Sequence, residues 1–281
     1  MAALPFGMVA ALVASRSVII FGDPRQLPPI VQADTAQAKQ WLGRDLFTQL
    51  DAADPAVDDP RRPILCVQHR MAPAIRTVVS RLFYANRLED GAGIATRPTR
   101  PGPALVLLDT SETGAQAITT GSSWQNPTHA DIIAELTASL TGLGEPDIGI
   151  ISPFSPQQRL LKEVVEARVP TFRRQGGFVR TIHRAQGGEQ DVIILDLTSA
   201  GKVSAFLDER SRIGGSLAQL LCVAISRARY RLIVVAHTAS FRAHFGRRGL
   251  IIRLLETVAR EGQYIRLGRT LSDVGAHFLH E

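Results

Sequence analysis

The fold class of this chain is indicated by the stretch Val18-Ile19-Ile20-Phe21-Gly22-Asp23-Pro24-Arg25-Gln26-Leu27-Pro28-Pro29. Four consecutive apolar residues followed by glycine and aspartate predict a buried parallel strand that ends in a loop. Ligands of open α/β sheets bind where such strands end, so the loop is a candidate site. Asp23 offers a carboxylate there, and the Gln26 amide can orient a water molecule or bind a phosphate oxygen.

Apolar runs and helix-like periodicities alternate along the rest of the chain. Helices are predicted over Trp41–Leu50, Pro73–Tyr84, His129–Leu143, Ser155–Ala167 and Leu217–Arg227, and in a basic tail after Ser240. Strands are predicted over Ile64–Val67, Ala104–Leu108, Ile148–Ile151, Phe178–Ile182, Val192–Leu197 and Leu232–Ala236. This alternation predicts an α/β fold, with a mostly parallel sheet and helices on both faces.

A composition break divides the chain. Residues 51–63 hold three prolines and four aspartates with little apolar content, which predicts a linker between a unit at 1–60 and a unit at 61–281. Residues 1–14 are apolar but lack the basic start of a signal peptide, so we expect a buried helix there. No apolar run reaches the roughly 18 residues of a membrane span. We therefore expect no membrane partner, and the two unpaired cysteines favour a reducing, cytoplasmic location.

Charge and cysteine content give weaker indications. The formal net charge is +6, and all but three of the 32 basic residues are arginine, which suits bidentate phosphate contacts. A GC-rich genome would give the same bias, so basicity alone does not identify a nucleic-acid-binding protein. Cys66 and Cys222 are too few and too far apart for a disulfide framework or a zinc site. Both lie in apolar runs and are interpreted as buried free thiols.

Two further runs place an arginine beside a predicted strand. In Gln68-His69-Arg70-Met71 the arginine follows a strand, and in Val223-Ala224-Ile225-Ser226-Arg227-Ala228-Arg229 it ends a helix. An arginine at either place can neutralise charge on a transferring phosphoryl group. Each could equally be a surface arginine if its run stood alone.

Two more runs carry polar groups suited to nucleotides and nucleic acid. In residues 181–191, Thr181 can donate to a phosphate and Glu189 can accept from a ribose hydroxyl. His183 has no second ligand at metal-binding spacing and is expected at most to lie along a bound strand. In residues 152–157, Phe154 could stack on a base or pack in the core.

Taken in order, these runs resemble motifs of superfamily 1 helicases, in the 5′→3′ nonsense-mediated-decay-like branch. Residues 22–29 resemble motif III, 68–71 motif IV, 181–191 motif V and 222–229 motif VI, and residues 152–157 resemble a PY..Q element. The resemblance covers residues 18–236 and implies a RecA-like fold of the P-loop NTPase type. Residues before the linker would then be the end of a first RecA-like domain, and 61–281 a second RecA-like domain.

The resemblance also implies ligands and roles. ATP and Mg²⁺ would lie between two RecA-like domains, and single-stranded DNA or RNA would cross them. Gln26, Arg70 and Arg227 would be catalytic, Arg227 as the arginine finger, and Asp23 and Glu189 would join them in binding the nucleotide. The residues expected along the nucleic acid are Pro153, Phe154, Thr181 and His183, with no metal ligand among any of these positions.

The chain departs from the family pattern at several positions. Cys222 replaces the usual Asn, Ser226 the usual Thr, Phe154 the usual Tyr, and His129 the usual Glu at the start of a helix. The first change removes an amide and puts the fine geometry of motif VI in doubt. At the helix start we expect Asn126 or Thr128 to be the N-cap, without a chemical role.

No G-x-x-x-x-G-K-[ST] phosphate loop occurs in the 281 residues, and the only Gly-Lys pair is Gly201-Lys202. We therefore expect no ATP hydrolysis by this chain alone, and a helicase N-terminal half as its partner, on another chain or in a lost segment. The alternatives are a non-catalytic single-strand-binding module and an inactive remnant. An apolar surface around residues 1–13 would also favour self-association.

Overall fold

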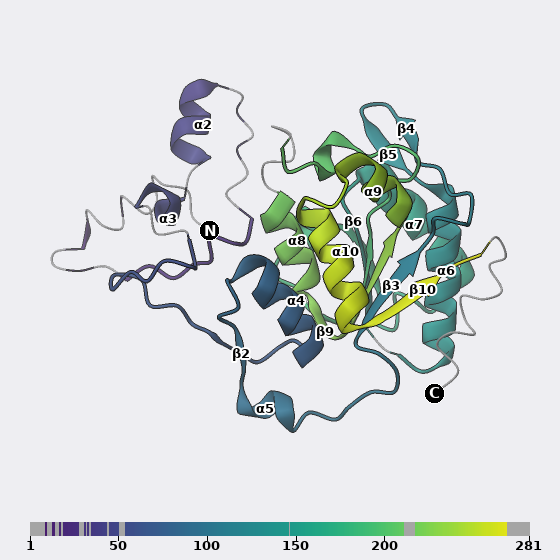
Figure 1. Cartoon of the computed structure of the whole chain (residues 1–281), viewed down its shortest axis with the longest axis horizontal. Helices are drawn as coiled ribbons and strands as arrows, with labels where there is room; N and C mark the ends of the chain where they lie inside the picture. Colours follow the sequence, from purple (N-terminus) through teal and green to yellow (C-terminus); the bar gives the residue numbers. More distant parts are fainter. Residues whose placement is uncertain are drawn as a thin grey trace.

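A parallel α/β sheet is the centre of the computed structural model, which describes residues 54–145, 147–210 and 217–268 and, of the first 50, positions 9, 13, 14, 17, 19–27, 31, 33, 35–43 and 45–50. The six strands lie in the order β10-β3-β9-β8-β6-β7, and every neighbouring pair is parallel (Figure 1). Their bounds are β3 Leu105–Asp109, β6 Ile148–Ser152, β7 Phe178–Thr181, β8 Gln190–Asp196, β9 Ala228–Ala236 and β10 Gln263–Arg266. The predicted α/β class is confirmed.

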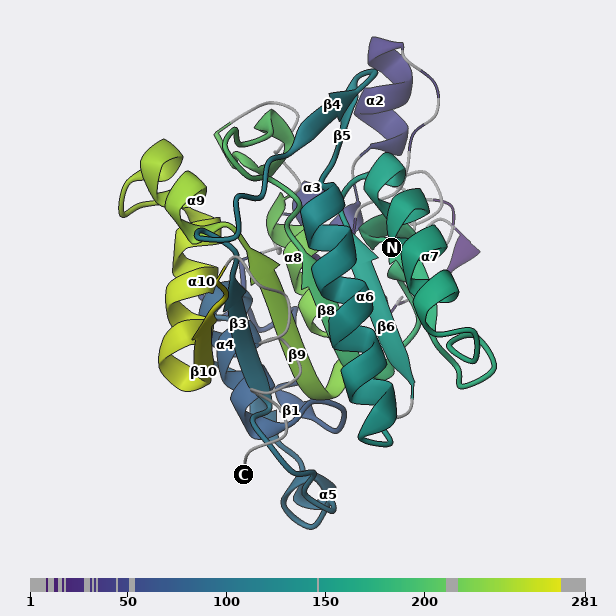
Figure 2. The same ribbon diagram turned by 90° about the vertical axis from the view of Figure 1, so that its right-hand side faces the viewer.

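Helices cover both faces of this sheet, because successive residues of its central strands point to opposite sides. Leu105 and Leu107 of β3 join one apolar cluster with α4, α8 and α10, while Val106 and Leu108 join another with α6 and α7. Figure 2 shows α6 and α7 lying together on their face of the sheet. The bounds are α4 Pro73–Phe83, α6 Pro127–Gly142, α7 Ser155–Arg168, α8 Leu217–Ile225 and α10 Leu250–Glu261.

The starts of these helices follow local chemistry. Pro73, Pro127 and Pro156 lie in the first turns of α4, α6 and α7, where a missing N–H costs nothing. Of the two N-caps expected for α6, Asn126 is the one used, since its side chain accepts from the His129 N–H. Four of these helices, α4, α6, α7 and α8, and five of the six sheet strands were predicted to within a few residues.

Several short elements were not predicted. They are the strand β2 Glu89–Asp90, which pairs in parallel with β1 Val67–Gln68, the hairpin β4 Ile118–Thr120 and β5 Ser123–Gln125, the helix α5 Ala92–Ala95, the 3-10 turns η1 Ile182–Ala185 and η2 Ala205–Leu207, and the edge strand β10. The basic tail is helical as expected, with α9 Thr238–Phe245 preceding α10.

The N-terminal predictions need correction. Residues 19–21 form no strand, and Ile19 and Phe21 are 80% and 84% exposed. The described part of the chain provides no partner strand for them, and an unpaired apolar run cannot hold strand geometry. Val9 and Val13 are likewise exposed, so the expected burial of residues 1–14 is wrong at these two positions, while most of that segment lies outside the described residues.

Two further boundaries differ. The helix expected over 41–50 is broken into α2 Ala36–Leu42 and α3 Leu46–Gln49. The strand expected over 64–67 is reduced to β1, which begins at Val67 and pairs only with β2. Residues 64–66 alternate in exposure without a neighbouring strand, so the apolar run there reflects contacts of single side chains. Residues 54–63 carry no helix or strand.

The motif III loop nevertheless packs against the sheet domain. Leu27 is 3% exposed and belongs to the apolar cluster formed by α4 and α8. Burying a leucine contributes about 2 kcal/mol, which fixes the loop beside these helices. None of the helices in the described ranges is both long and apolar enough to cross a membrane.

Candidate nucleotide-binding site

Strand register brings Glu189 and Arg227 together. Gln190, the first residue of β8, pairs with Ala228, the first residue of β9, so the residues preceding them are neighbours at the amino end of the sheet. The Gln190 N–H donates to the Arg227 carbonyl at 3.0 Å. Two runs nearly 40 residues apart in sequence thus supply adjacent side chains. This site therefore lies opposite the carboxyl edge, where ligands of open α/β sheets are generally found.

Arginines surround the Glu189 carboxylate. Arg70 Nε donates to Glu189 Oε2 at 2.7 Å, and Arg229 Nε lies 3.8 Å from Glu189 Oε1. The loop before α4 is fixed in turn, because the Ala72 N–H donates to the Arg229 carbonyl. The hydrogen bond from Arg70 lowers the pKa of Glu189, so this carboxylate is ionised at neutral pH.

Arg227 is a buried charge without a counter-ion. Its side chain bonds only uncharged oxygens: Nε donates to the Val223 carbonyl, Nη1 to the Gly188 carbonyl at 3.0 Å, and Nη2 to Ser226 Oγ. The residue is 3% exposed, and no carboxylate of the described chain lies within 4.0 Å of it. Burial and then the nearby Arg70 charge lower the pKa of Arg227. Such a cation favours a bound anion.

A hydrogen-bond chain links motif III to motif VI. Asp23 Oδ2 accepts from Gln26 Nε2 at 2.9 Å and from the Tyr84 hydroxyl at 2.5 Å. Cys222 Sγ donates to the same hydroxyl at 3.5 Å. Burial raises the pKa values of both Tyr84 and Cys222, that of Cys222 to about 12, so both stay protonated and act as donors. Asp23 therefore orients Gln26 on the α4–α8 side of the sheet.

The residues predicted along the nucleic acid lie at the opposite end of the sheet. Thr181 ends β7 and pairs with Ser152 at the end of β6, which Pro153 and Phe154 follow. Thr181 and Pro153 are half-buried, and His183 is exposed in η1. The two predicted residue sets thus occupy the two ends of the strands, with the nucleotide set at the amino ends.

Phe154 lies in the core in this conformation. It is 6% exposed, and its ring centroid is 5.8 Å from that of Phe206. Of the two interpretations left open by the sequence, this placement matches the core aromatic at a strand-to-helix turn.

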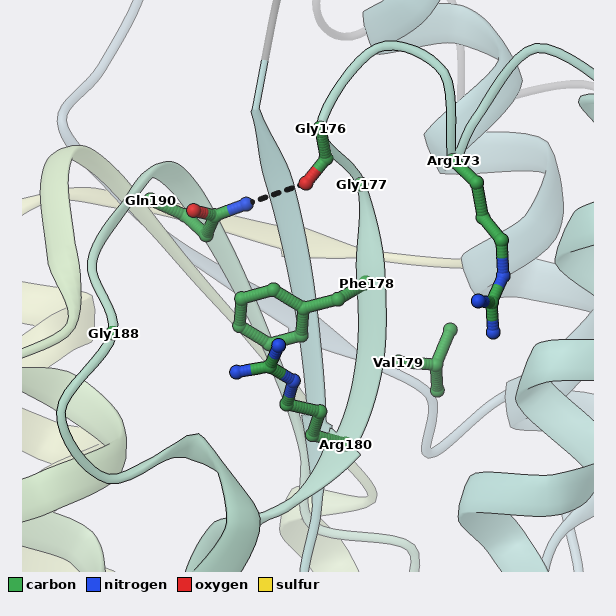
Figure 3. A pocket seen from close by; sticks show the side chains of 8 residues that line it. All are labelled: Arg173, Gly176, Gly177, Phe178, Val179, Arg180, Gly188 and Gln190. Carbon is green, nitrogen blue, oxygen red and sulfur yellow. Dashed lines mark hydrogen bonds between the residues drawn. The ribbon is translucent and has the colours of Figure 1, made fainter.

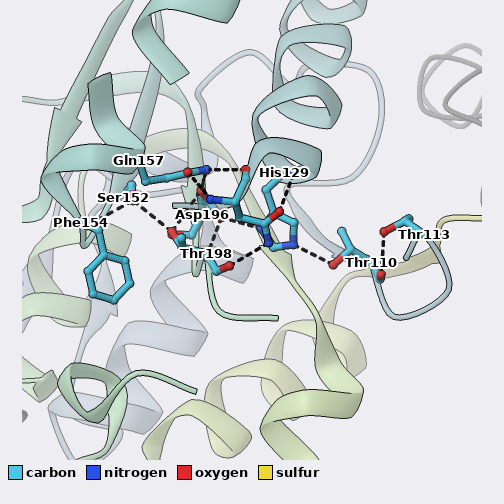
Figure 4. A network of polar contacts seen from close by, with 9 residues as sticks. Thr110, Thr113, His129, Ser152, Phe154, Gln157, Asp196 and Thr198 are labelled. Carbon is cyan, nitrogen blue, oxygen red and sulfur yellow. Dashed lines mark hydrogen bonds and ion pairs between the residues drawn. The ribbon is translucent and has the colours of Figure 1, made fainter. Parts of the chain in front are cut away.

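A buried polar network at the carboxyl edge was missed (Figure 4). His129 Nδ1 bonds Asp196 Oδ1 and Nε2 bonds Thr110 Oγ1, both at 2.8 Å, and His129, Asp196 and Thr110 are fully buried. Gln157 Nε2 donates to Asp196 Oδ2 at 2.7 Å. The one sequence feature that could have revealed this network is His129, which stands where the family usually has Glu. A histidine can bond the Asp196 carboxylate opposite it, whereas a glutamate would repel that carboxylate. The network connects α6 and α7 to the ends of β3 and β8.

Two other contributors were assigned no definite role from sequence. Arg229 bridges Glu189 and Asp191, with its Nη1 3.2 Å from Asp191 Oδ1. Tyr84 connects motif III to motif VI, as described above. The side-chain directions of these two residues depend on the packing of α4 against β9 and α8, which no local pattern reveals.

Comparison with known proteins gives a family match over most of the chain. The profile of a family described as "AAA domain" matches residues 42–239. The chain belongs to this family. Curated helicases of superfamily 1 also match it over most of its length, which confirms the resemblance found in the motifs.

Three relatives illustrate the match. A "Regulator of nonsense transcripts 1 homolog" from Neurospora crassa is 27% identical over 83% of this chain and 21% of that protein. The "DNA replication ATP-dependent helicase/nuclease JHS1" of Arabidopsis thaliana is 27% identical over 94% of this chain and 20% of that protein. The "DNA replication ATP-dependent helicase/nuclease DNA2" of Gallus gallus is 28% identical over 83% of this chain and 22% of that protein. The chain therefore spans about a fifth of the length of these relatives.

A solved structure, the C-terminal domain of a possible DNA helicase from a Lactobacillus strain, is 16% identical, covers 71% of this chain and 98% of that one, and has a TM-score of 0.41.

Proposed function

We propose that this chain is the second motor half of an ATP-dependent superfamily 1 nucleic-acid helicase. Its role is to supply the arginine-finger side of an ATP site and part of a single-strand track. The observation that carries the proposal is the buried Arg227 guanidinium, which is held by carbonyl and hydroxyl oxygens and has no carboxylate within 4.0 Å among the residues the structure describes. A phosphate group would compensate this charge at the place where a phosphoryl group is transferred.

The surrounding residues fit the same ligand. Arg70 lies beside Arg227 and pairs with Glu189, so an incoming phosphate competes with the Glu189 carboxylate for its guanidinium. Glu189 would then be free to accept from a ribose hydroxyl. Gln26, fixed by Asp23, would orient the attacking water, and Arg229 would hold Glu189 from its other side.

ATP supplies the leaving group and the energy of closure, and Mg²⁺ neutralises charge on its phosphates. The guanidiniums of Arg70 and Arg227 fit a triphosphate. The magnesium fits less well, because no group of three His, Cys, Asp or Glu capable of holding a metal ion occurs in the described ranges. Together with the lack of a phosphate-loop sequence, this supports a shared site in which another P-loop domain holds the metal.

The strand track would cross the carboxyl edge at Thr181 and Pro153, with single-stranded DNA or RNA as the ligand. Motor function then requires that the nucleotide site at one end of the strands influences the track at the other. A chain that binds strands but never contributes to hydrolysis would be a binding module instead, which the following test separates.

Reconstitution with a P-loop domain tests the proposal. The chain is mixed with the N-terminal RecA-like domain of a helicase of the same branch, and ATP hydrolysis is measured with single-stranded DNA and with RNA. We expect hydrolysis from the mixture only, and a loss of at least 10³-fold in Arg227→Ala, the order that a finger arginine contributes. The matched control is Arg253→Ala, on the exposed side of α10. Hydrolysis by the chain alone, or by the R227A mixture at the normal rate, contradicts the proposal.

A further inference from the structure

A cavity of about 420 Å³ opens at the amino end of the edge strand β7 (Figure 3). Its lining includes Arg173, Phe178, Arg180, Gly188 and Gln190. The motifs gave no function to Arg173, Phe178, Arg180 or Gln190. The cavity is distinct from the Arg227 cluster but shares a wall with it, because Gly188 directly precedes Glu189.

The arginines of this cavity are arranged for an anion. The Arg180 guanidinium lies over the Phe178 ring, 4.3 Å from its centroid, as Figure 3 shows. Stacking fixes the plane of the guanidinium and leaves its N–H groups directed outward along its edge. Arg180 has no carboxylate or hydrogen-bond acceptor within the described chain, whereas Arg173 pairs with Glu166.

The loop after α7 forms part of the cavity wall and is fixed to the sheet. Gly176 has a φ of +85°, and its carbonyl accepts from Gln190 Nε2 at 2.9 Å, which ties the loop after α7 to the start of β8. A Cβ on Gly188 would lie 3.8 Å from Arg180 Nη1, so a longer side chain at this position would extend toward the guanidinium. An acidic group does reach the rim, since Asp147 Oδ1 lies against Gly176.

The charge extends along the edge of the sheet. Arg174, Arg180 and Arg184 are exposed, and none has a carboxylate partner within 4.0 Å among the residues the structure describes. Thr181, at the proposed strand track, lies between the last two. A row of unpaired arginines beside an open cavity suits a polyanion running along β7 better than a single small anion.

The cavity is also coupled to the nucleotide side. The Gly188 carbonyl that accepts from Arg227 Nη1 belongs to the segment that forms the cavity wall. A ligand that displaced this segment would move an acceptor of the buried Arg227 and the adjacent Glu189.

We propose that the cavity beside Arg180 binds a backbone phosphate of a single-stranded nucleic acid. The contact extends the strand track from Thr181 along the β7 edge and places a strand phosphate against the segment that holds Arg227. The proposal rests on the proposed function in that the same strand passes Thr181. Its chemistry is phosphate recognition, which a nucleotide phosphate would share.

The test measures strand affinity against salt. A fluorescein-labelled oligodeoxythymidine and its RNA counterpart are titrated with the full chain by anisotropy between about 50 and 200 mM KCl. The variants are Arg180→Ala, Arg180→Lys, Thr181→Ala and the distant control Arg253→Ala, each checked by thermal unfolding. Binding of a fluorescent ATP analogue and competition by inorganic phosphate are measured in parallel.

We expect R180A to weaken strand binding about tenfold at the lowest salt and to reduce the salt slope by about 0.7, the value for one phosphate on a single strand. R180K should retain most of the slope, and R253A should match wild type. Equal binding by R180A and R253A overturns the inference. Loss of nucleotide-analogue binding without a change in strand slope also overturns it, because the phosphate would then belong to the nucleotide.

The two proposals fail in different ways. If T181A weakens strand binding and R180A does not, the strand track stands and the cavity contact is wrong. If wild type shows no salt-dependent strand binding, both the track and the cavity contact are wrong, while the nucleotide role of Arg227 is still judged by reconstitution.

Discussion

Replacing His129 by the glutamate that its family usually has at this position should destabilise the protein severely. His129 Nδ1 is 2.8 Å from Asp196 Oδ1, and both side chains are fully buried. His129→Glu would place a second carboxylate against Asp196, and two buried carboxylates at this distance cannot both be ionised. The change that looks most conservative by family comparison is therefore predicted to be the least tolerated.

The magnitude follows from what the substitution removes. It deletes a hydrogen bond to a buried carboxylate and the bond to Thr110, and it adds like-charge repulsion. Leaving a buried carboxylate without its partner costs about 3 to 5 kcal/mol. At about 3 °C per kcal/mol for a chain of this size, the melting temperature should fall by about 10 to 15 °C. His129→Ala leaves a cavity without the repulsion, so at neutral pH we expect a smaller loss, of about 2 to 4 kcal/mol.

The assay is thermal and urea unfolding followed by circular dichroism, at about pH 8 and about pH 5. The repulsion in H129E raises the pKa of one carboxyl in the folded state above its unfolded value of about 4.3. The stability deficit of H129E relative to H129A should thus be largest at the higher pH and shrink at the lower one. His183→Ala, at an exposed site, is the control and should change stability by less than about 0.5 kcal/mol. The reasoning is refuted if H129E equals H183A or exceeds H129A in stability at about pH 8.

Three other predictions concern the N-terminal contacts and the thiols. Cys222, whose pKa burial raises to about 12, should resist iodoacetamide in the native protein up to strongly alkaline pH, while half-buried Cys66 reacts; peptide mass spectrometry before and after unfolding in urea measures both, and rapid native labelling of Cys222 would disprove its burial. Tyr84→Phe removes the hydroxyl that donates to the motif III carboxylate, which should cost about 1 to 2 kcal/mol in urea unfolding and speed hydrogen exchange in residues 22–27, whereas Tyr230→Phe should do neither. The exposed Phe21 should promote self-association, so Phe21→Ser should lower the apparent mass in light scattering at high concentration; a monomeric wild-type chain would contradict this.

The strands of the sheet domain were predictable because their apolar sequences match the burial that these strands have in the fold. Runs such as Ile148–Ile151 and Val192–Leu197 are apolar on both faces, and both faces are indeed covered by helices. The short edge strand β10 was missed because it has four residues and only one of them, Ile265, is buried. One buried apolar residue gives no periodic pattern from which a strand can be predicted. The run at Val18–Phe21 has the same apolar composition as a core strand. Its described residues, 19–21, form no strand, because pairing partners, not composition, make a strand.

The candidate site shows the same division. Gln26, Arg70, Glu189 and Arg227 were singled out because each belongs to a run with a recognisable order. What the sequence could not give is how these residues contact one another. The Arg70–Glu189 pair and the Arg227–Gly188 bond both depend on the register of β8 against β9, which is set by long-range packing. His129 was set aside because the carboxylate that explains it is 67 residues away in sequence.

The contacts of the 186–191 segment suggest how the two ends of the sheet would communicate in a motor. Gly188 accepts from Arg227, Glu189 from Arg70, and Asp191 is bridged by Arg229, so this segment is held by all three arginines of the nucleotide side. The same segment begins five residues after the end of β7, and the intervening turn η1 packs on α8. In the proposed motor, a phosphate between Arg70 and Arg227 would compete with Glu189 for Arg70 and release part of this hold. Movement of so short a connection would be transmitted to Thr181 and Arg180, because few residues separate them and η1 is buried at Ile182 and Ala185. The coupling would therefore be carried by one continuous backbone segment.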